Sequence, residues 1–252
     1  MNLISKLFPR HRINRIKNLP IYFLYHLNFK IINFLKSEYN NFFDSSHAKK
    51  MKINISNNFI DEANEDLRKK NRDYFKKDKG SFLYYDYQTD YFNQVNLAWN
   101  YNKKKYYNFF ENNFGDITRN IYHGYNYRIE HIFLYETINK NKKESYNLNS
   151  KFHLDGDLPG ALKVLVYLCD VNDDNGPFVY KYNNEEIKVR GETGTSVIFQ
   201  QNKCLHAASN TILNKRIAIS FLIYPTLNKK LIELDTKPIN AMCSLNPFTK
   251  YT

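Results

Sequence analysis

Short β-rich segments follow one another between residues 161 and 224, and dense turn signals separate them. Residues 161–169 (ALKVLVYLC) form an apolar run rich in Val and Leu, which is typical of a buried strand. Residues 170–177 (DVNDDNGP) are a turn cluster, and a second turn at 191–194 (GETG) precedes another short strand at 195–199. Strands that follow one another through such turns predict a mainly β domain.

The segment 216–224 (RIAISFLIY) alternates between two kinds of side chain. Because successive residues of a strand point to opposite sides, the segment presents two different faces. One face begins with polar and small residues and suits the interior of a barrel; it holds Arg216, Ala218, Ser220, Leu222 and Tyr224. The other face is wholly apolar and predicts packing against a covering layer; it holds Ile217, Ile219, Phe221 and Ile223.

Two histidines and one aspartate accompany these strands in a pattern that suits a metal ion. His153 and Asp155 are two residues apart, so both side chains point the same way in an extended segment. His206 has to come from a distant strand that the fold brings alongside. Two imidazoles and one carboxylate on one face of a ferrous ion leave the opposite face open for a chelating 2-oxo acid and dioxygen. These three residues are therefore our candidate iron ligands, and Arg216 is our candidate for binding the acid end of a co-substrate.

The same residues resemble the phytanoyl-CoA dioxygenase-like branch of the iron(II)/2-oxoglutarate-dependent oxygenases. The similar region spans about residues 148–224, under a third of the chain. Its motifs are His153-Leu-Asp155-Gly-Asp, the segment 162–178 (LKVLVYLCDVNDDNGPF), the segment 206–210 (HAASN) and Arg216. No single motif is specific, but their combined spacing is.

The resemblance implies a double-stranded β-helix (jelly-roll) core that N-terminal helices buttress. It also implies that His153, Asp155 and His206 hold the iron. Arg216 would then pair with the distal carboxylate of 2-oxoglutarate. Ser220 lies on the same strand face and is a candidate for an additional contact with that co-substrate.

The implied activity is oxidative decarboxylation of 2-oxoglutarate to succinate and carbon dioxide, coupled to hydroxylation of a small-molecule substrate by dioxygen. The carboxylate of Asp155 favours hydroxylation, because related halogenases have a small residue there. One departure concerns the substrate: relatives often carry Gly-Ser-His soon after the Gly-Pro-Phe turn, whereas this chain has residues 180–186 (YKYNNEE). The identity of the substrate therefore does not follow from the resemblance.

Several alternatives stay open at this stage. The chain could be a cupin-type metal dioxygenase that does not use 2-oxoglutarate, or a non-enzymatic jelly-roll binding module. A lone histidine in a β-rich run is usually a hydrogen-bonded core or loop residue, and Arg216 could be a surface or ion-paired arginine. We expect His123 and His131 to be structural and Asp157 to be a turn residue.

The composition excludes some classes of function. The formal net charge is +12, but Lys and Asn are frequent throughout and no arginine-rich stripe indicates nucleic-acid binding. The three cysteines, Cys169, Cys204 and Cys243, are an odd number without metal-type spacing, which favours a reducing, cytoplasmic location. No obligate protein partner is indicated.

The chain divides into a basic N-terminal extension, residues 1–45, and a single oxygenase domain, residues 46–252, whose barrel core covers about residues 125–224. Apolar residues 19–29 are too short and too interrupted to span a bilayer. We expect the extension to be helical and to pack on the barrel. The alternative is a basic amphipathic element that makes peripheral contact with an anionic membrane surface.

Helices are expected ahead of the barrel. The first covers about residues 59–75, with Asn57 or Asn58 as its cap, and the second covers 90–114 and breaks at Gly115. A short strand or extended loop is expected at 81–87, a strand at 129–138, and a surface loop at 139–149. Beyond Tyr224 the chain is a proline-punctuated tail.

Overall fold

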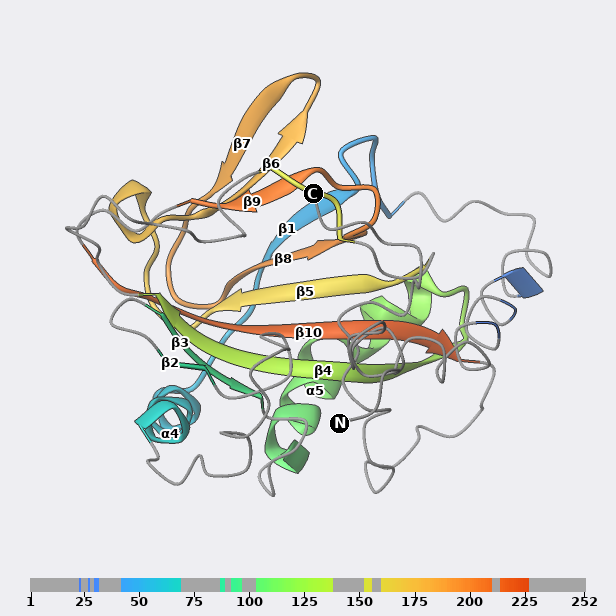
Figure 1. Ribbon diagram of the computed structural model, residues 1–252. Helices are drawn as coiled ribbons and strands as arrows, with labels where there is room; N and C mark the ends of the chain where they lie inside the picture. Colours follow the sequence, from blue (N-terminus) through green and yellow to red (C-terminus); the bar gives the residue numbers. More distant parts are fainter. Residues whose placement is uncertain are drawn as a thin grey trace, which may run out of the picture.

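The structure, a computed structural model, describes residues 42–68, 87–88, 92–96, 103–137, 152–155, 160–209 and 214–226, together with Phe23, Leu27, Lys30 and Ile31. Within these residues the paired strands form two antiparallel sheets (Figure 1). The large sheet contains β1 (Ala48–Lys52), β2 (Tyr87–Gln88), β3 (Phe92–Asn96), β4 (Asn126–Thr137), β5 (Leu162–Tyr167), β8 (Thr195–Phe199) and β10 (Arg216–Thr226). The small sheet contains β6 (Phe178–Tyr182), β7 (Glu185–Val189) and β9 (His206–Ala208).

The order of the strands defines a double-stranded β-helix. The large sheet runs β1-β8-β5-β10-β4-β3-β2, and the small sheet runs β7-β6-β9. An antiparallel bridge between His153 and His206 adds one more segment beside β9. From β5 to β10 the chain passes from the large sheet to the small sheet and back twice, which confirms the expected mainly β, jelly-roll fold.

The strand β10 separates two apolar clusters, as its alternation predicts. Its outward residues Ile217, Ile219, Phe221 and Ile223 join the cluster under the helices, and Ala218 joins the cluster between the two sheets. The inner cluster also contains Leu165 and Tyr167 of β5 and Phe178 of β6. The inner face of β10 therefore contributes to the packing between the sheets, and Arg216 and Ser220 are buried polar residues on that face.

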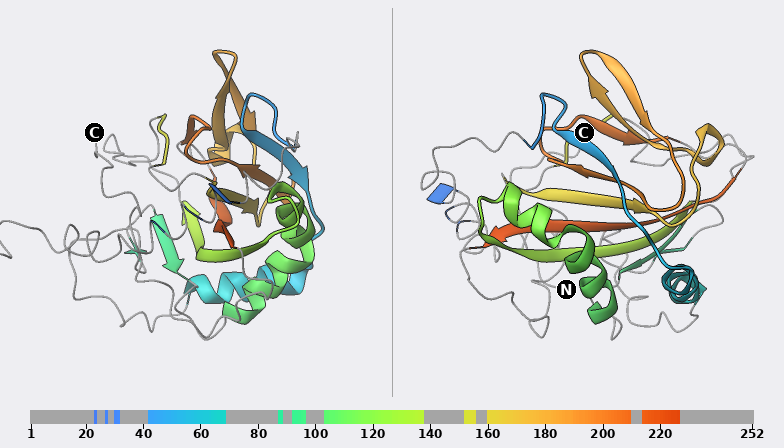
Figure 2. Two further views of the ribbon diagram at one scale, coloured as in Figure 1. Left: turned by 90° about the vertical axis from the view of Figure 1, so that its right-hand side faces the viewer. Right: turned by 180° about the vertical axis from the view of Figure 1, so that it is seen from behind.

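Two helices, α4 (Asn57–Arg68) and α5 (Lys103–Ile121), cover the outer face of the large sheet, and Figure 2 shows α5 lying across it. The Phe110 ring of α5 packs against Phe221 of β10 with ring centroids 4.9 Å apart. The buried carboxylate of Asp66 in α4 accepts a hydrogen bond from the Tyr106 hydroxyl of α5, at 2.7 Å. The helices are thus tied both to the sheet and to each other.

The structure corrects two expectations about the helices. The first helix is capped by Ser56, whose hydroxyl accepts a hydrogen bond from the Phe59 amide at 3.3 Å, and not by Asn57 or Asn58, which lie inside it. The bounds expected for the second helix, 90–114, were wrong at both ends. Its first part is strand β3, and α5 continues through Gly115 to Ile121.

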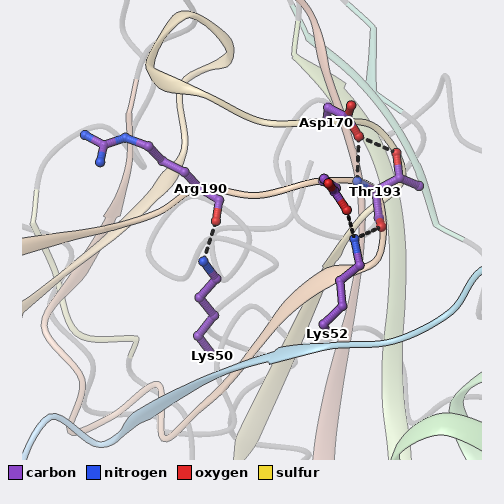
Figure 3. A network of polar contacts seen from close by, with 6 residues as sticks. Lys50, Lys52, Asp170, Arg190 and Thr193 are labelled. Atoms are coloured by element: carbon purple, nitrogen blue, oxygen red, sulfur yellow. Dashed lines mark hydrogen bonds and ion pairs between the residues drawn. The ribbon is translucent and has the colours of Figure 1, made fainter.

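Polar contacts fix the edge strand β1 against the turn before β8 (Figure 3). The Lys50 ammonium donates to the Arg190 carbonyl oxygen at 2.6 Å, and Lys52 donates to the Thr193 carbonyl oxygen at 2.7 Å. The amide and hydroxyl of Thr193 both donate to Asp170, at 2.7 and 3.0 Å. These contacts join β1, the turn after β5 and the turn before β8 at one corner of the large sheet.

The segment that departs from the resembled family lies in the hairpin of β6 and β7, which extends away from the large sheet (Figure 1). Asn183 and Asn184 connect the strands, with φ angles of 50° and 66°. Two consecutive positive φ values are those of a type I′ turn, which matches the right-handed twist of the flanking strands. Asparagine tolerates this conformation better than most residues.

Several expectations lie outside the described residues. They are most of the 1–45 extension, the end of the first helix beyond Arg68, most of residues 81–87, the 139–149 loop, Asp157, Cys243 and the tail beyond Thr226. In the part of the chain that is described, no helix is long and apolar enough to cross a membrane.

Candidate metal centre

The backbone brings His153 and His206 side by side although 52 positions separate them in the chain. Each amide donates to the carbonyl oxygen of the other residue, at 2.9 Å and 3.1 Å. Such a directly opposed pair in an antiparallel ladder places both side chains on the same face. The two imidazole ring centroids are 4.5 Å apart.

Asp155 joins the two histidines from the same extended segment as His153. Its amide donates to the Gln201 carbonyl oxygen at 3.0 Å, which fixes the segment two residues beyond the bridge. Its carboxylate oxygens lie 3.5 Å from the Nε2 of His153 and 3.5 Å from the Nε2 of His206. One ligand atom from each of the three residues lies within 4.8 Å of the other two. The structure therefore brings together all three residues that the sequence predicted as ligands.

The ring of His206 is held in one tautomer. Its Nδ1 lies 2.9 Å from the Cys204 carbonyl oxygen, and a carbonyl can only accept, so Nδ1 carries the hydrogen. In the neutral ring the Nε2 lone pair then points toward Asp155 and is available to a metal. The rings of Phe178 and Phe199 pack at 5.5 and 4.9 Å from the imidazole and bury it.

The carboxylate of Asp155 stays ionised at neutral pH. Burial alone raises the pKa of this carboxyl, but the charge of Lys163 and the proximity of the His153 and His206 rings outweigh it and lower the pKa well below its usual range. A negative oxygen beside two imidazoles, one of them with its lone pair free, is a donor set that suits a divalent transition metal such as ferrous iron. The residues present therefore fit the expected ion.

Arg216 lies at the start of β10 with its side chain buried inside the barrel. One guanidinium nitrogen donates to the Gly176 carbonyl oxygen, and the other lies 3.5 Å from the Thr137 hydroxyl. Its Nε has no hydrogen-bond partner, and no acidic side chain among the described residues forms an ion pair with the group. A buried guanidinium with a donor to spare is a binding position for a carboxylate.

Ser220 is also buried on the inner face of β10, between Phe133 of β4 and Leu165 of β5. At about 3.3 Å per residue, its offset of four residues from Arg216 amounts to roughly 13 Å along the strand. That separation favours contacts of the two side chains with different parts of a bound molecule.

Sequence reasoning missed Lys163, whose ammonium lies 2.9 Å from the Oδ2 of Asp155. The side chain belongs to β5, where Leu162, Val164 and Val166 face the helices. The sequence did indicate this position: in the run 161–169 the one lysine is two residues from Leu165, so both side chains point to the inner face of the strand. The apolar majority of the run obscures this signal.

The two histidines that we expected to be structural, His123 and His131, do not belong to the His-Asp-His cluster in the described part of the chain. His123 lies in the turn after α5 with a φ of 57°, outside the sheets. His131 is buried in β4, and Leu222 of β10 lies between it and Lys163 in the strand register. Burial and the nearby charge of Lys163 lower the pKa of His131 to about 3, so this ring is neutral.

Comparison with known proteins gives a likeness of fold. No protein-family model matches the chain, and its sequence matches none of the curated proteins with which it was compared. Among solved structures, an oxidoreductase of the 2OG-Fe(II) oxygenase family from Burkholderia pseudomallei aligns with 71% of this chain and 84% of its own, at 9% identity and a TM-score of 0.52.

Two further solved structures of similar fold contain bound ligands. HygX from Streptomyces hygroscopicus, with nickel and 2-oxoglutarate bound, aligns over 76% of this chain and 87% of its own, at 11% identity and a TM-score of 0.51. EctD from S. alaskensis, with 2-oxoglutarate and 5-hydroxyectoine, aligns over 72% of this chain and 73% of its own, at 14% identity and a TM-score of 0.54.

These observations define the structural class to which the chain is similar. The chain has the double-stranded β-helix fold that is found in iron(II)/2-oxoglutarate oxygenases, and inside it a His-Asp-His cluster that could hold a metal ion. Identities between 9% and 14% show the shared fold and do not assign a particular family within it.

Proposed function

We propose that this protein is an iron(II)- and 2-oxoglutarate-dependent oxygenase that hydroxylates a small-molecule substrate with release of succinate and carbon dioxide. The observation that carries the proposal is the presence of two complementary groups inside one barrel. One is the cluster of two histidines and one aspartate, and the other is a buried arginine that has no acidic partner among the described residues. Together they suit a metal ion and the dicarboxylate that chelates it.

His153, Asp155 and His206 would hold the ferrous ion on one face and leave the opposite face for 2-oxoglutarate and dioxygen. The bound iron supplies the activation of dioxygen that couples decarboxylation of the oxo acid to oxidation of the substrate. The protein contributes placement. The His153–His206 bridge fixes two ligands in register, and the Cys204 carbonyl orients the His206 ring.

Arg216 would bind the distal carboxylate of 2-oxoglutarate. Its Nε hydrogen has no acceptor in the part of the chain that the structure describes, so a carboxylate oxygen would satisfy it. The surroundings are dry, which strengthens a charge-assisted bond of this kind. Ser220 would contact a different part of the bound co-substrate, closer to Lys163.

Within the superfamily, the phytanoyl-CoA dioxygenase-like branch remains our proposal. The sequence His153-Leu-Asp155-Gly-Asp and the spacing from His206 to Arg216 support it. Retention of a carboxylate at Asp155 supports hydroxylation as the outcome. The described ligand of EctD, 5-hydroxyectoine, is a small molecule, which is the class of product that we propose here.

We also propose the cytoplasm as the location, with residues 46–252 as the oxygenase domain and residues 1–45 as a basic extension. Strand β1 begins at Ala48, close to the proposed boundary. Phe23 and Leu27 are four residues apart, helical and exposed, which is compatible with an apolar stripe on that extension.

The function is tested by anaerobic titration of ferrous iron into the metal-free chain, followed by assay of succinate formation from 2-oxoglutarate. We expect about one iron per chain and succinate production, and we expect His206→Ala to lose both. His123→Asn is the matched control, because it removes a histidine outside the sheets and asparagine tolerates the positive φ at that turn.

The cupin-type alternative predicts iron binding without succinate formation, and the binding-module alternative predicts no transition-metal binding at all. If His153→Ala and His206→Ala both keep wild-type iron affinity and turnover, the ligand assignment is wrong.

A further inference from the structure

Lys163 is a charged side chain on an interior strand of the large sheet. Strand β5 is paired on both sides, with β8 and with β10, and Lys163 lies opposite Phe199 on one side and Leu222 on the other. The ammonium reaches Oδ2 of Asp155 at 2.9 Å. Both side chains are partly shielded from water, with exposures of 28% and 21%. This pair is therefore built into the sheet and differs from a mobile surface pair.

The two carboxylate oxygens of Asp155 have different surroundings. Oδ1 lies 3.5 Å from the Nε2 of His153. Oδ2 lies 3.5 Å from the Nε2 of His206 and also accepts the hydrogen bond from Lys163. An oxygen that already accepts a charge-assisted hydrogen bond is the weaker donor to a metal, so Oδ1 is the oxygen left for coordination.

From this asymmetry we propose that Lys163 is a positioning residue of the metal centre. Its ammonium holds Oδ2, so that Asp155 offers Oδ1 alone to the ion and binds it through one oxygen. A carboxylate without that restraint can turn and chelate the ion with both oxygens. The second oxygen would then occupy a position that the co-substrate needs. The identity of the ion and of the co-substrate rests on the proposed function; the role of Lys163 toward a divalent metal does not.

A different role for the same contact makes the opposite prediction. If Lys163 is only a counter-ion that neutralises Asp155 in the absence of metal, the ammonium competes with the metal and repels it. Removing the ammonium would then raise metal affinity. A positioning role predicts a loss, because a residue that orients a ligand typically contributes about 10- to 100-fold to metal affinity.

The test is an anaerobic titration of Fe(II) into the metal-free full chain, in wild type and in three variants. Lys163→Met keeps the length of the side chain and removes the donor; we expect about 10- to 100-fold weaker metal binding. Lys163→Arg keeps a charged donor and should recover most of that affinity. Lys188→Met is the control. Lys188 is also a strand residue whose ammonium pairs with an aspartate, Asp173 at 3.1 Å, but this pair does not include any of the three candidate ligands.

A second measurement on the same samples is the binding of 2-oxoglutarate to the metal-loaded forms, which is monitored through the metal-to-ligand absorption band. Lys163→Met should bind the oxo acid more weakly and shift the band, and Lys163→Arg should restore it. Unchanged or tighter metal binding by Lys163→Met would overturn the proposal and favour the counter-ion role.

If Lys163→Met does not fold, the structure of the metal-loaded wild-type chain decides. Coordination by Oδ1 alone, with Oδ2 still hydrogen-bonded to Lys163, supports the proposal, and coordination by both oxygens overturns it. Wild-type chain that binds iron but forms no succinate would refute the proposed function while leaving these metal-binding results interpretable.

Discussion

At the scale of single residues, Arg216 is the group by which the proposed 2-oxoglutarate enzyme would differ from other metal-binding jelly rolls. Its guanidinium is buried, and its hydrogen bonds go to a carbonyl and a hydroxyl, which carry no charge to balance it. A buried cation without a counter-ion is costly, so a dicarboxylate that pairs with it gains both the ionic bond and the relief of that cost.

We therefore expect Arg216→Ala to weaken 2-oxoglutarate binding by about ten- to a hundredfold, since such a bond contributes about 1.5–3 kcal/mol and about 1.4 kcal/mol corresponds to a factor of ten. Arg216→Lys should also be impaired, because lysine lacks the planar pair of donors. The measurement is a titration of 2-oxoglutarate against the anaerobic iron form. Arg190→Ala, an exposed arginine paired with Asp173, is the control. Unchanged affinity in both Arg216 variants would exclude this residue from the site.

His131 should make the protein less stable in weak acid. Its folded pKa of about 3 lies below the usual value of 6.5, mainly because burial disfavours the charged ring. Between those two values the unfolded chain binds a proton that the folded chain does not, so stability falls as pH falls below 6.5, by up to about 1.4 kcal/mol per pH unit. His131→Gln removes this contribution, and urea unfolding at pH 6.5, 5.5 and 4.5 should show a shallower decline. An identical decline in the variant and in wild type would contradict the assignment.

That His153 and Asp155 point the same way was predictable because strand geometry fixes where i and i+2 point, and Arg216 and Ser220 share a face of an alternating strand. The pairing of His153 with His206 and the contact of Lys163 with Asp155 were not predictable in the same way. Both depend on which strands become neighbours and in which register, and a single sequence does not contain that information.

At the scale of elements, the strands of the barrel followed their sequence patterns and the preceding helices did so less well. Residues 216–224 alternate, and β10 occupies those positions with only a short extension. In the 90–114 segment, a high density of aromatic residues fits a helix or a strand, and pairing with β4 decided in favour of strand β3 for residues 92–96.

Gly115 was expected to end a helix, yet it lies inside α5. A Cβ at this position would come within 2.8 Å of the Glu111 carboxylate, so the glycine leaves room for that side chain. In that space the Glu111 carboxylate forms an ion pair with Arg119 at 2.8 Å and accepts a hydrogen bond from the Tyr127 hydroxyl of β4. The tertiary contact outweighs the low helix propensity of glycine, which is about 1 kcal/mol.

The turn before β8 should be intolerant of substitution at Gly194. Its φ is +89°, and an added Cβ would lie 2.2 Å from the Ile53 carbonyl oxygen, so Gly194→Ala forces the backbone of β8 away from the segment that follows β1. We expect a loss of at least about 1–3 kcal/mol in the free energy of unfolding, measured in urea. Gly124→Ala is the matched control: its φ is +83°, but nothing lies within 4 Å of the added Cβ. Equal losses in the two variants would mean that the close approach to Ile53 contributes nothing.

At the scale of the whole molecule, charge is distributed unevenly along the chain. Residues 1–45 contain seven Lys and Arg against one Glu and one Asp, which gives 7 − 2 = +5. In that segment Phe23 and Leu27 are exposed, with 65% and 55% of their surface accessible. Basic residues together with exposed apolar ones are the combination that binds anionic lipid surfaces.

If the extension contacts membranes, the full chain should sediment with anionic liposomes and release as salt is raised, because screening weakens the attraction of exposed charges. A chain that starts at Phe42 keeps β1 intact and should stay in the supernatant. Uncharged liposomes serve as the control for apolar adsorption. Equal sedimentation of the two chains would leave packing on the barrel as the role of the extension.

The position of β10 in the large sheet has a consequence for the newly made chain. A ribosome releases β4 and β5 well before residues 216–226, yet β10 lies between them and pairs with both. Until it emerges, two strand edges in the middle of the future sheet are unpaired, and exposed edges of this kind recruit other chains. The nascent protein should therefore depend on chaperones during that interval. If the three candidate ligands hold the proposed iron, loading should follow release of His206, the last of the three to be synthesised.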